Sequence, residues 1–214
     1  MKKWKLFIPG AAVFALFALF TWSLGFVDVR PVGPMDSCVA YAGVNKAVHG
    51  FFGVNRLLYT LTDWAGVIAI AVAMGFAAMG LAQWIRRRRI CRVDGGILLL
   101  GAFYIFVFGA YAFFEMKVVN RRPILIGGIL EASYPSSTTM LAMCVMPAAM
   151  LQFRRLIKRP WLMKAVNILC GAFTAFMVIG RLLCGAHWLT DILGGAMFSL
   201  SAVLIYRAAL KCLE

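Results

Sequence analysis

The residues best suited to chemistry lie near the C-terminal end of the chain, in the stretch GRLLCGAHWLTD. His187 and Asp191 are four residues apart, so on a helix they share one face. A carboxylate placed there can accept a hydrogen bond from one imidazole nitrogen, which fixes the tautomer and frees the other nitrogen as a nucleophile or base. Arg181 lies close enough in the chain to reach the same pocket. The alternative is a purely structural His–Asp pair.

A second polar group, YPSST, lies where an apolar segment begins. Pro135 suits the first turn of a helix, where its missing N–H costs little. The hydroxyls of Ser136 and Ser137 and the free N–H groups of that turn form a typical anion site. Ordinary N-capping is the simpler explanation, but it accounts for one serine rather than for the whole run.

The third group, KVVNRRP, supplies positive charge. Arg122 precedes Pro123, which favours an extended backbone, and its guanidinium can bind two phosphate oxygens at once. Lys117 and Arg121 are weaker candidates, and Arg121 is better explained by an interaction with lipid headgroups. Together the three groups suit a phosphoryl group that is attacked by histidine while arginines hold the developing charge. This chemistry needs no metal or other cofactor.

The composition places these groups in a membrane protein. The chain has 214 residues, of which 63% are hydrophobic, and a mean hydropathy of +0.87. A soluble domain of this length could not bury so much apolar surface. We therefore predict an all-α, polytopic membrane protein with one domain, residues 1–214, built as a bundle of six transmembrane helices. The expected spans are 6–27, 64–84, 95–114, 138–153, 163–183 and 188–206.

The charges predict how these spans are oriented. If the span ends alternate, one side holds 15 of the 22 basic residues and two of the eight acidic ones, for a net +13, and the other side has a net +1. Positive charge collects on the cytoplasmic side, so both termini are expected there and the three polar groups on the outer face of the cell membrane. The run RRRRICR is then a topology anchor. Contact with lipid headgroups or with nucleic acid is the alternative, and we expect no nucleic-acid partner.

The stretch between the first two spans is too long for a simple turn. Trp64 and Trp84 bracket the second span at the spacing of the two membrane interfaces. Before it, residues 44–64 carry apolar side chains at three- and four-residue steps, which predicts one or two external amphipathic helices. The first span could be a cleaved signal peptide, but its apolar run of about 22 residues favours a retained anchor. Cys38 and Cys184 could pair on the outer side, although nothing in the spacing requires it.

The order and spacing of the three groups resemble the motifs of the type-2 phosphatidic acid phosphatase family of membrane lipid phosphatases, K-x6-R-P, P-S-G-H and S-R-x5-H-x3-D. The resemblance covers about residues 60–206 and includes the six-span plan. The third motif matches best, with Arg181, His187 and Asp191 at the family's spacing and Gly180 in place of its serine.

The resemblance implies a role for each matching residue. His187 would be the nucleophile that forms a phosphohistidine, and Asp191 would orient it. Arg181, Ser136 and Arg122 would bind phosphate. The substrate would be a lipid phosphate or a polyprenyl diphosphate, and the surrounding membrane lipids would be the protein's other contacts.

Two positions depart from the family pattern. Lys117 lies five residues before Arg122, where the family has a lysine seven residues before its arginine. Thr138 stands where the family has the histidine that protonates the leaving oxygen, and threonine cannot act as a general acid near neutral pH. The other histidine of the chain, His49, lies in the external stretch. We therefore expect a preference for a substrate such as undecaprenyl diphosphate, whose lipid monophosphate leaves without protonation.

Other functions stay open at this point. The chain could transfer the phosphoryl group to an acceptor other than water. It could also be a catalytically weak or silent protein that binds lipid phosphate, having kept the pocket and lost the acid. A transporter is less well supported, because no inverted repeat is evident. The sequence fixes neither the lipid nor the oligomeric state.

Overall fold

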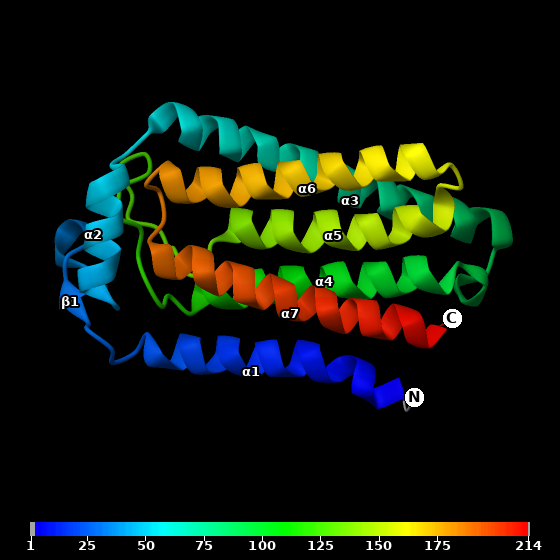
Figure 1. Ribbon diagram of the computed structural model, residues 1–214, viewed down its shortest axis with the longest axis horizontal. Helices are drawn as coiled ribbons and strands as arrows, with labels where there is room; N and C mark the ends of the chain where they lie inside the picture. The colour runs from blue at the N-terminus through cyan, green and yellow to red at the C-terminus, as the bar shows by residue number, and fades with distance from the viewer. Residues whose placement is uncertain (1–2, 214) are drawn as a thin grey trace.

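A computed structural model describes residues 3–213. Six long helices run along one axis and a shorter one, α2, lies across one end of them (Figure 1). A 3-10 turn, Lys3–Phe7, leads into the first helix, and two short antiparallel strands pair Arg30 with Val39. The helices are α1 (Ile8–Ser23), α2 (Ala42–Phe52), α3 (Arg56–Arg87), α4 (Gly95–Met116), α5 (Ser137–Leu156), α6 (Pro160–Leu183) and α7 (Leu189–Leu213), and the strands are β1 (Arg30–Pro31) and β2 (Cys38–Val39).

Five helical segments in the described part of the chain are long and apolar enough to cross a membrane. They are Lys3–Ser23, which ends in α1, and the helices α3, α4, α6 and α7. Many of their large apolar side chains are exposed, as expected where lipid covers the surface. The chain is therefore a multi-pass membrane protein.

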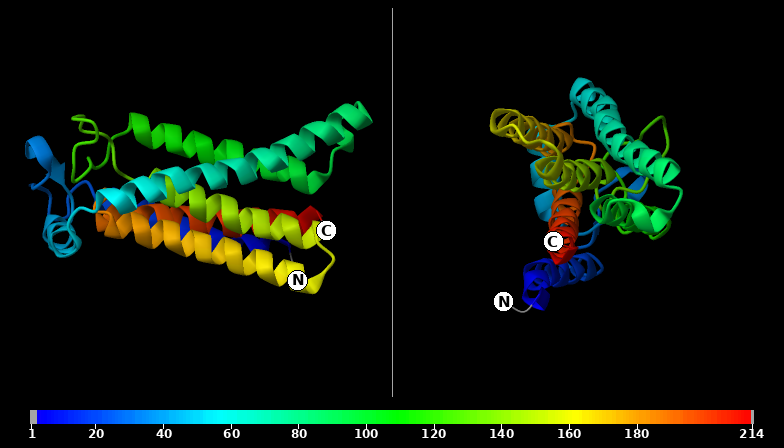
Figure 2. Two further views of the ribbon diagram at one scale, coloured as in Figure 1. Left: turned by 90° about the horizontal axis from the view of Figure 1, so that it is seen from above. Right: turned by 90° about the vertical axis from the view of Figure 1, so that its right-hand side faces the viewer.

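The remaining long helix, α5, corresponds to the fourth predicted span but is not among these five segments. It packs against α3, α4, α6 and α7 and lies at the centre of the bundle in the end-on view (Figure 2). Its buried Gln152 donates to the carbonyl of Gly96 at 2.9 Å and also hydrogen-bonds the hydroxyl of Tyr206. A helix surrounded by protein needs less apolar surface than one facing lipid, and the count of six spans stays a prediction.

The two described ends of the chain lie at the same end of the bundle (Figure 1). The connections between α3 and α4 and between α5 and α6 lie there as well, and they carry Arg88, Arg89 and Arg92 of the arginine run together with Lys158 and Arg159. The opposite end holds α2 and the connections that contain the three polar groups. This arrangement agrees with the predicted alternation of span ends, while the side of the membrane that each end faces stays a prediction.

Several predicted boundaries were wrong. Residues 56–63, assigned to the external amphipathic stretch, form the first two turns of α3, because the side chain of Asn55 caps the helix there by accepting from the N–H of Leu58 at 2.9 Å. Of that stretch, α2 is the part that forms a separate helix. The last helix continues to Leu213 instead of ending at residue 206. All six cysteines are free.

A hairpin within the connection from α4 to α5 was also not predicted. Gly127 and Gly128 both have positive φ, 57° and 83°, which is the backbone that a two-residue hairpin turn requires, and Ile126 pairs with Ile129 across it. Arg121 pairs with Ala132 further along the two arms. The turn therefore brings the basic KVVNRRP segment beside the residues that lead into α5.

Candidate functional site

A small, partly open cavity lies at the end of the bundle where the three polar groups meet. His187 comes from the turn between α6 and α7, Arg122 from the hairpin, and Ser137 from the start of α5. The other walls are formed by the hairpin and by α4 and α5, through Tyr111, Phe114, Glu115, Ala132, Ser133, Tyr134, Pro135 and Met140. The predicted convergence of three distant segments is thus what the fold produces.

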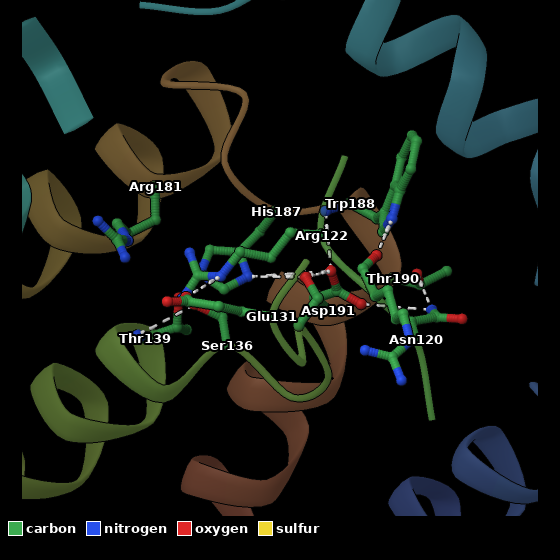
Figure 3. Close-up of polar contacts among 12 residues, drawn as sticks. Asn120, Arg122, Glu131, Ser136, Thr139, Arg181, His187, Trp188, Thr190 and Asp191 are labelled. Carbon is green, nitrogen blue, oxygen red and sulfur yellow. Dashed lines mark hydrogen bonds and ion pairs between the residues drawn. The ribbon is translucent and has the colours of Figure 1, made fainter. Parts of the chain in front are cut away.

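His187 and Asp191 are both buried and lie near each other in the site (Figure 3). The hydroxyl of Ser133 contacts the side chains of both. The Nδ1 of His187 is 3.9 Å from the nearer carboxylate oxygen of Asp191, too far for a hydrogen bond. The Ser133 hydroxyl lies 3.1 Å from Nδ1 and donates to that same oxygen. The direct contact expected from the i, i+4 spacing is therefore replaced by a bridge.

The carboxylate of Asp191 receives two further hydrogen bonds. The backbone N–H of Trp188 donates to it at 2.9 Å, and the side-chain amide of Asn120 donates at 3.3 Å. With the Ser133 hydroxyl, three donors surround a carboxylate that is fully buried at the start of α7. A buried carboxylate with this many partners is held in one orientation.

Arg122 faces the other nitrogen of the imidazole. Its Nη1 lies 3.5 Å from Nε2 of His187, and its Nε lies 3.1 Å from a carboxylate oxygen of Glu131. The hairpin fixes the position of this arginine, because its backbone N–H donates to the carbonyl of Glu131 at 3.1 Å. A cation and the free ring nitrogen of His187 therefore share one wall of the cavity.

The pKa of His187 is lowered well below its ordinary value of 6.5. Burial is the main cause, and the positive charges of Arg122 and Arg181 act in the same direction, while a hydrogen bond to the backbone of Ser133 opposes them. The imidazole is therefore neutral near pH 7, and one of its nitrogens carries a free lone pair.

The start of α5 differs from the prediction in its first residue. Ser136 is the N-cap, with its hydroxyl accepting from the N–H of Thr139 at 3.4 Å, so Pro135 lies before the helix and not in its first turn. The backbone N–H of Ser136 donates to the carbonyl of Asp191 at 3.1 Å, which joins the start of α5 to that of α7. Ser137 lines the cavity, whereas the half-buried Thr138 does not.

Three predicted phosphate-binding residues do not line the cavity: the fully buried helix cap Ser136, Arg181 and Lys117. Arg181 is buried, but its Nη1 contacts Thr62 at 3.4 Å and Asp63 at 3.6 Å, apart from the Arg122–His187 pair (Figure 3). Its guanidinium also lies over the ring of Tyr59, 4.9 Å from the centroid. Lys117 is exposed at the end of α4.

The packing of α6 on α3 explains why glycine precedes Arg181. A Cβ added at Gly180 would lie 2.6 Å from Cγ2 of Thr62, closer than two such atoms can approach. The serine of the family motif would therefore not fit without moving Thr62. The hydroxyl of the same threonine accepts from Arg181 at 3.4 Å.

The sequence reasoning missed Ser133, Asn120 and Glu131. They lie beside residues that were singled out, and the Gly–Gly pair flanked by apolar residues is a hairpin signal that could have placed them opposite Arg122. It also missed Asn45 of α2, which is fully buried and donates to the hydroxyl of Thr190 at 3.0 Å. His49, on the same helix, lies 3.2 Å from the carbonyl of Gly185 and does not line the cavity.

Comparisons with known proteins give one family match and one similar fold. The PAP2 superfamily model matches residues 112–212, a segment that includes the hairpin, α5, α6 and α7. A search of curated protein sequences gave no match. The fold is similar to the crystal structure of the first transmembrane PAP2 type phosphatidylglycerolphosphate phosphatase from Bacillus subtilis, with a TM-score of 0.64 and 19% identity over 95% of this chain and 96% of that one. The matched segment is similar to the PAP2 superfamily and contains the residues that first suggested this family, and the fold is shared with the Bacillus subtilis protein along almost the whole chain.

Proposed function

We propose that this protein is a lipid phosphatase of the outer face of the cell membrane, and that it hydrolyses a polyprenyl diphosphate or a lipid phosphate through a phosphohistidine. The observation that carries the proposal is the pair of contacts made by His187. One ring nitrogen is connected through Ser133 to Asp191, and the other faces Arg122 in the cavity. An oriented and neutral imidazole beside a guanidinium suits nucleophilic attack on phosphorus.

In the first step Nε2 of His187 bonds to the terminal phosphorus while the bond from that phosphorus to the oxygen of the leaving group breaks; the leaving group is a lipid monophosphate when the substrate is a diphosphate and a lipid alcohol when it is a monophosphate. Arg122, the Ser137 hydroxyl and the free N–H groups at the start of α5 hold the negative charge on the phosphoryl oxygens. Water then attacks phosphorus, the N–P bond breaks, and inorganic phosphate leaves with His187 restored. The Nδ1 proton stays in place throughout, directed at Ser133.

The leaving group decides which substrate suits this site. In the first step, a diphosphate releases a lipid monophosphate that is stable as an anion, whereas a lipid monophosphate must release an alcohol that needs a proton. Thr138 cannot supply that proton, and it does not line the cavity. We therefore propose undecaprenyl diphosphate, or a polyprenyl diphosphate like it, as the preferred class of substrate.

Purified protein should release phosphate faster from undecaprenyl diphosphate than from lipid monophosphates. Phosphatidic acid and phosphatidylglycerolphosphate are the matched monophosphates, the second being the substrate named for the similar solved structure. The measurement is kcat/KM for each lipid at equal mole fraction in detergent micelles. Equal rates, or a faster reaction with either monophosphate, would contradict the preference.

The orientation of the bundle supports placing the site on the outer face. The segments that line the cavity connect helices at the end of the bundle that holds α2, whereas the described ends of the chain and the connection with the arginine run lie at the other end (Figure 1). Positive residues collect on the cytoplasmic side of membrane proteins, so the cavity end is expected outside. Accessibility of Cys38, which is exposed near the cavity end, to a membrane-impermeant thiol reagent in intact cells tests this orientation.

The pH dependence of activity should reflect the lowered pKa of His187. The neutral imidazole is the nucleophile, so we expect kcat/KM to keep its value as the pH falls through 6.5, the ordinary pKa of histidine, and to decline only at the lower pH where His187 itself becomes protonated. Below about pH 6.5, His187 binds a proton more readily in the unfolded state than in the folded state. Its contribution to the free energy of unfolding should therefore decrease as the pH drops below about 6.5. Activity and thermal unfolding measured between about pH 5 and 8 test both statements.

The absence of the general acid favours one other function. A protein that binds lipid phosphate without turning it over would need the pocket but not the acid. It would bind undecaprenyl diphosphate and release no phosphate, and His187→Ala would change nothing in cells. A phosphotransferase would instead give labelled phosphate on a lipid acceptor rather than on water.

A further inference from the structure

We propose that Ser133 is a positioning residue for the reaction, which carries the hydrogen bond between His187 and Asp191 and so sets the tautomer of the nucleophile. This inference rests on the proposed function, because it assigns His187 the role of nucleophile. It adds a third residue to the expected His–Asp pair.

The distances require an intermediate group. His187 Nδ1 and the nearer oxygen of Asp191 are 3.9 Å apart, beyond the range of an N–H···O hydrogen bond. The Ser133 hydroxyl lies 3.1 Å from Nδ1 and is hydrogen-bonded to the same carboxylate oxygen. It therefore contacts both partners that do not contact each other.

The hydrogen atoms can be placed by exclusion. An ionised carboxylate accepts only, so the hydroxyl hydrogen of Ser133 points to Asp191. The hydroxyl oxygen is then the acceptor for His187, and Nδ1 must carry the ring hydrogen. A neutral imidazole with its hydrogen on Nδ1 has its lone pair on Nε2, the atom that faces Arg122 and the cavity.

Ser133 is held so that its hydroxyl has little freedom to turn away. Its side chain is 3% exposed, and its backbone N–H donates to the carbonyl of Asn120 at 2.9 Å. The next residue, Tyr134, is buried, and its hydroxyl hydrogen-bonds Thr21 of α1 at 2.6 Å. A Cβ added at Gly194 would lie 2.3 Å from this ring, so the tyrosine packs closely on α7 beside Asp191.

A different role for Ser133 is conceivable, because the residue also lines the cavity. If its hydroxyl only bound a phosphate oxygen, its removal would weaken substrate binding and leave the ring of His187 unchanged. If it positions His187, its removal leaves Nδ1 without an acceptor in a buried place, and the tautomer is no longer fixed. The two roles therefore predict different changes in kcat, in KM and in the ring nitrogens.

The kinetic test compares Ser133→Ala with Ser133→Thr. We expect the alanine variant to lose roughly 10- to 100-fold in kcat, as for other residues that fix the tautomer of a functional histidine, with little change in KM. Threonine keeps the hydroxyl and should restore most of the rate. Ser199→Ala, which removes a buried hydroxyl from α7 outside the site, is the matched control and should keep wild-type activity. A rise in KM at unchanged kcat in Ser133→Ala would overturn the proposal.

A second measurement does not depend on turnover. The chain has two histidines, so in a His49→Gln background ¹⁵N-histidine labelling reports on His187 alone. We expect one tautomer with the hydrogen on Nδ1, and a mixture or the opposite tautomer after Ser133→Ala. The same single tautomer in both proteins would overturn the proposal. A third result is possible, in which the wild-type protein shows no activity in any assay but Ser133→Ala changes the tautomer of His187 as expected. This result would contradict the proposed function and support the role of Ser133 in fixing the tautomer.

Discussion

Replacing His187 by alanine should lower phosphate release from undecaprenyl diphosphate by roughly 10⁴- to 10⁶-fold, the loss seen when a catalytic nucleophile or its base is removed. The reason is that no other group in the cavity combines a free lone pair with a fixed orientation. His187→Gln should be equally inactive, and its amide can still hydrogen-bond Ser133, so a folded but inactive protein would separate chemistry from stability. Initial rates and thermal unfolding of both variants are the measurements.

The intermediate can be trapped in the same proteins. Rapid acid-free quenching with a substrate labelled in its terminal phosphate should leave label on the wild-type chain, at an alkali-stable and acid-labile bond. His49→Gln is the matched control, since it removes the other histidine while its amide can replace the 3.2 Å contact with Gly185. Label that disappears in His49→Gln and persists in His187→Gln would contradict the assignment of the nucleophile.

Thr138→His should raise the rate with phosphatidic acid by about 10²- to 10⁴-fold, the usual contribution of a general acid. The rate with undecaprenyl diphosphate should change little, because its leaving group departs as a stable anion. Thr138 is the second residue of α5, one position after the cavity-lining Ser137, so a longer side chain there can reach the leaving oxygen. The measurement is kcat/KM for the two lipids in the wild type and the variant.

Thr138→Gln provides the control for side-chain size. Glutamine is similar in length to histidine and cannot donate a proton at this pH, so its rates should stay near those of the wild type. A gain with Thr138→Gln as large as that with Thr138→His would show that packing, and not proton transfer, limits the reaction. An equal gain of Thr138→His with both lipids would contradict the leaving-group argument.

The parts of the site that could be predicted are those fixed by local spacing. His187 and Asp191 are four residues apart at a helix start, Arg122 is held before a proline, and Ser136 begins a helix within an apolar chain. Each of these predictions depends only on residues within one segment of the chain. The apolar segments likewise predicted the six long helices, with errors of about two turns where capping, as at Asn55, extended a helix beyond its apolar part.

The parts that could not be predicted depend on contacts between segments. The side chain between His187 and Asp191 is that of Ser133. Ser133 lies on the hairpin arm opposite to Arg122, more than 50 residues before His187 in the chain. The place of Arg181 depends on Thr62 and Asp63 of α3, more than 100 residues away in the chain. Periodicity carries no information on such pairs, which is why Arg181 was expected in the cavity and lies beside it.

The wall that α4 contributes to the cavity has a consequence for how the enzyme we propose would meet its substrate. Tyr111 and Phe114 lie in a membrane-spanning helix, so this side of the cavity borders on the bilayer and not only on water. A lipid then arrives by lateral diffusion in two dimensions. The rate should follow the mole fraction of substrate in the membrane, and diluting it with inert phospholipid should slow the reaction at constant bulk concentration.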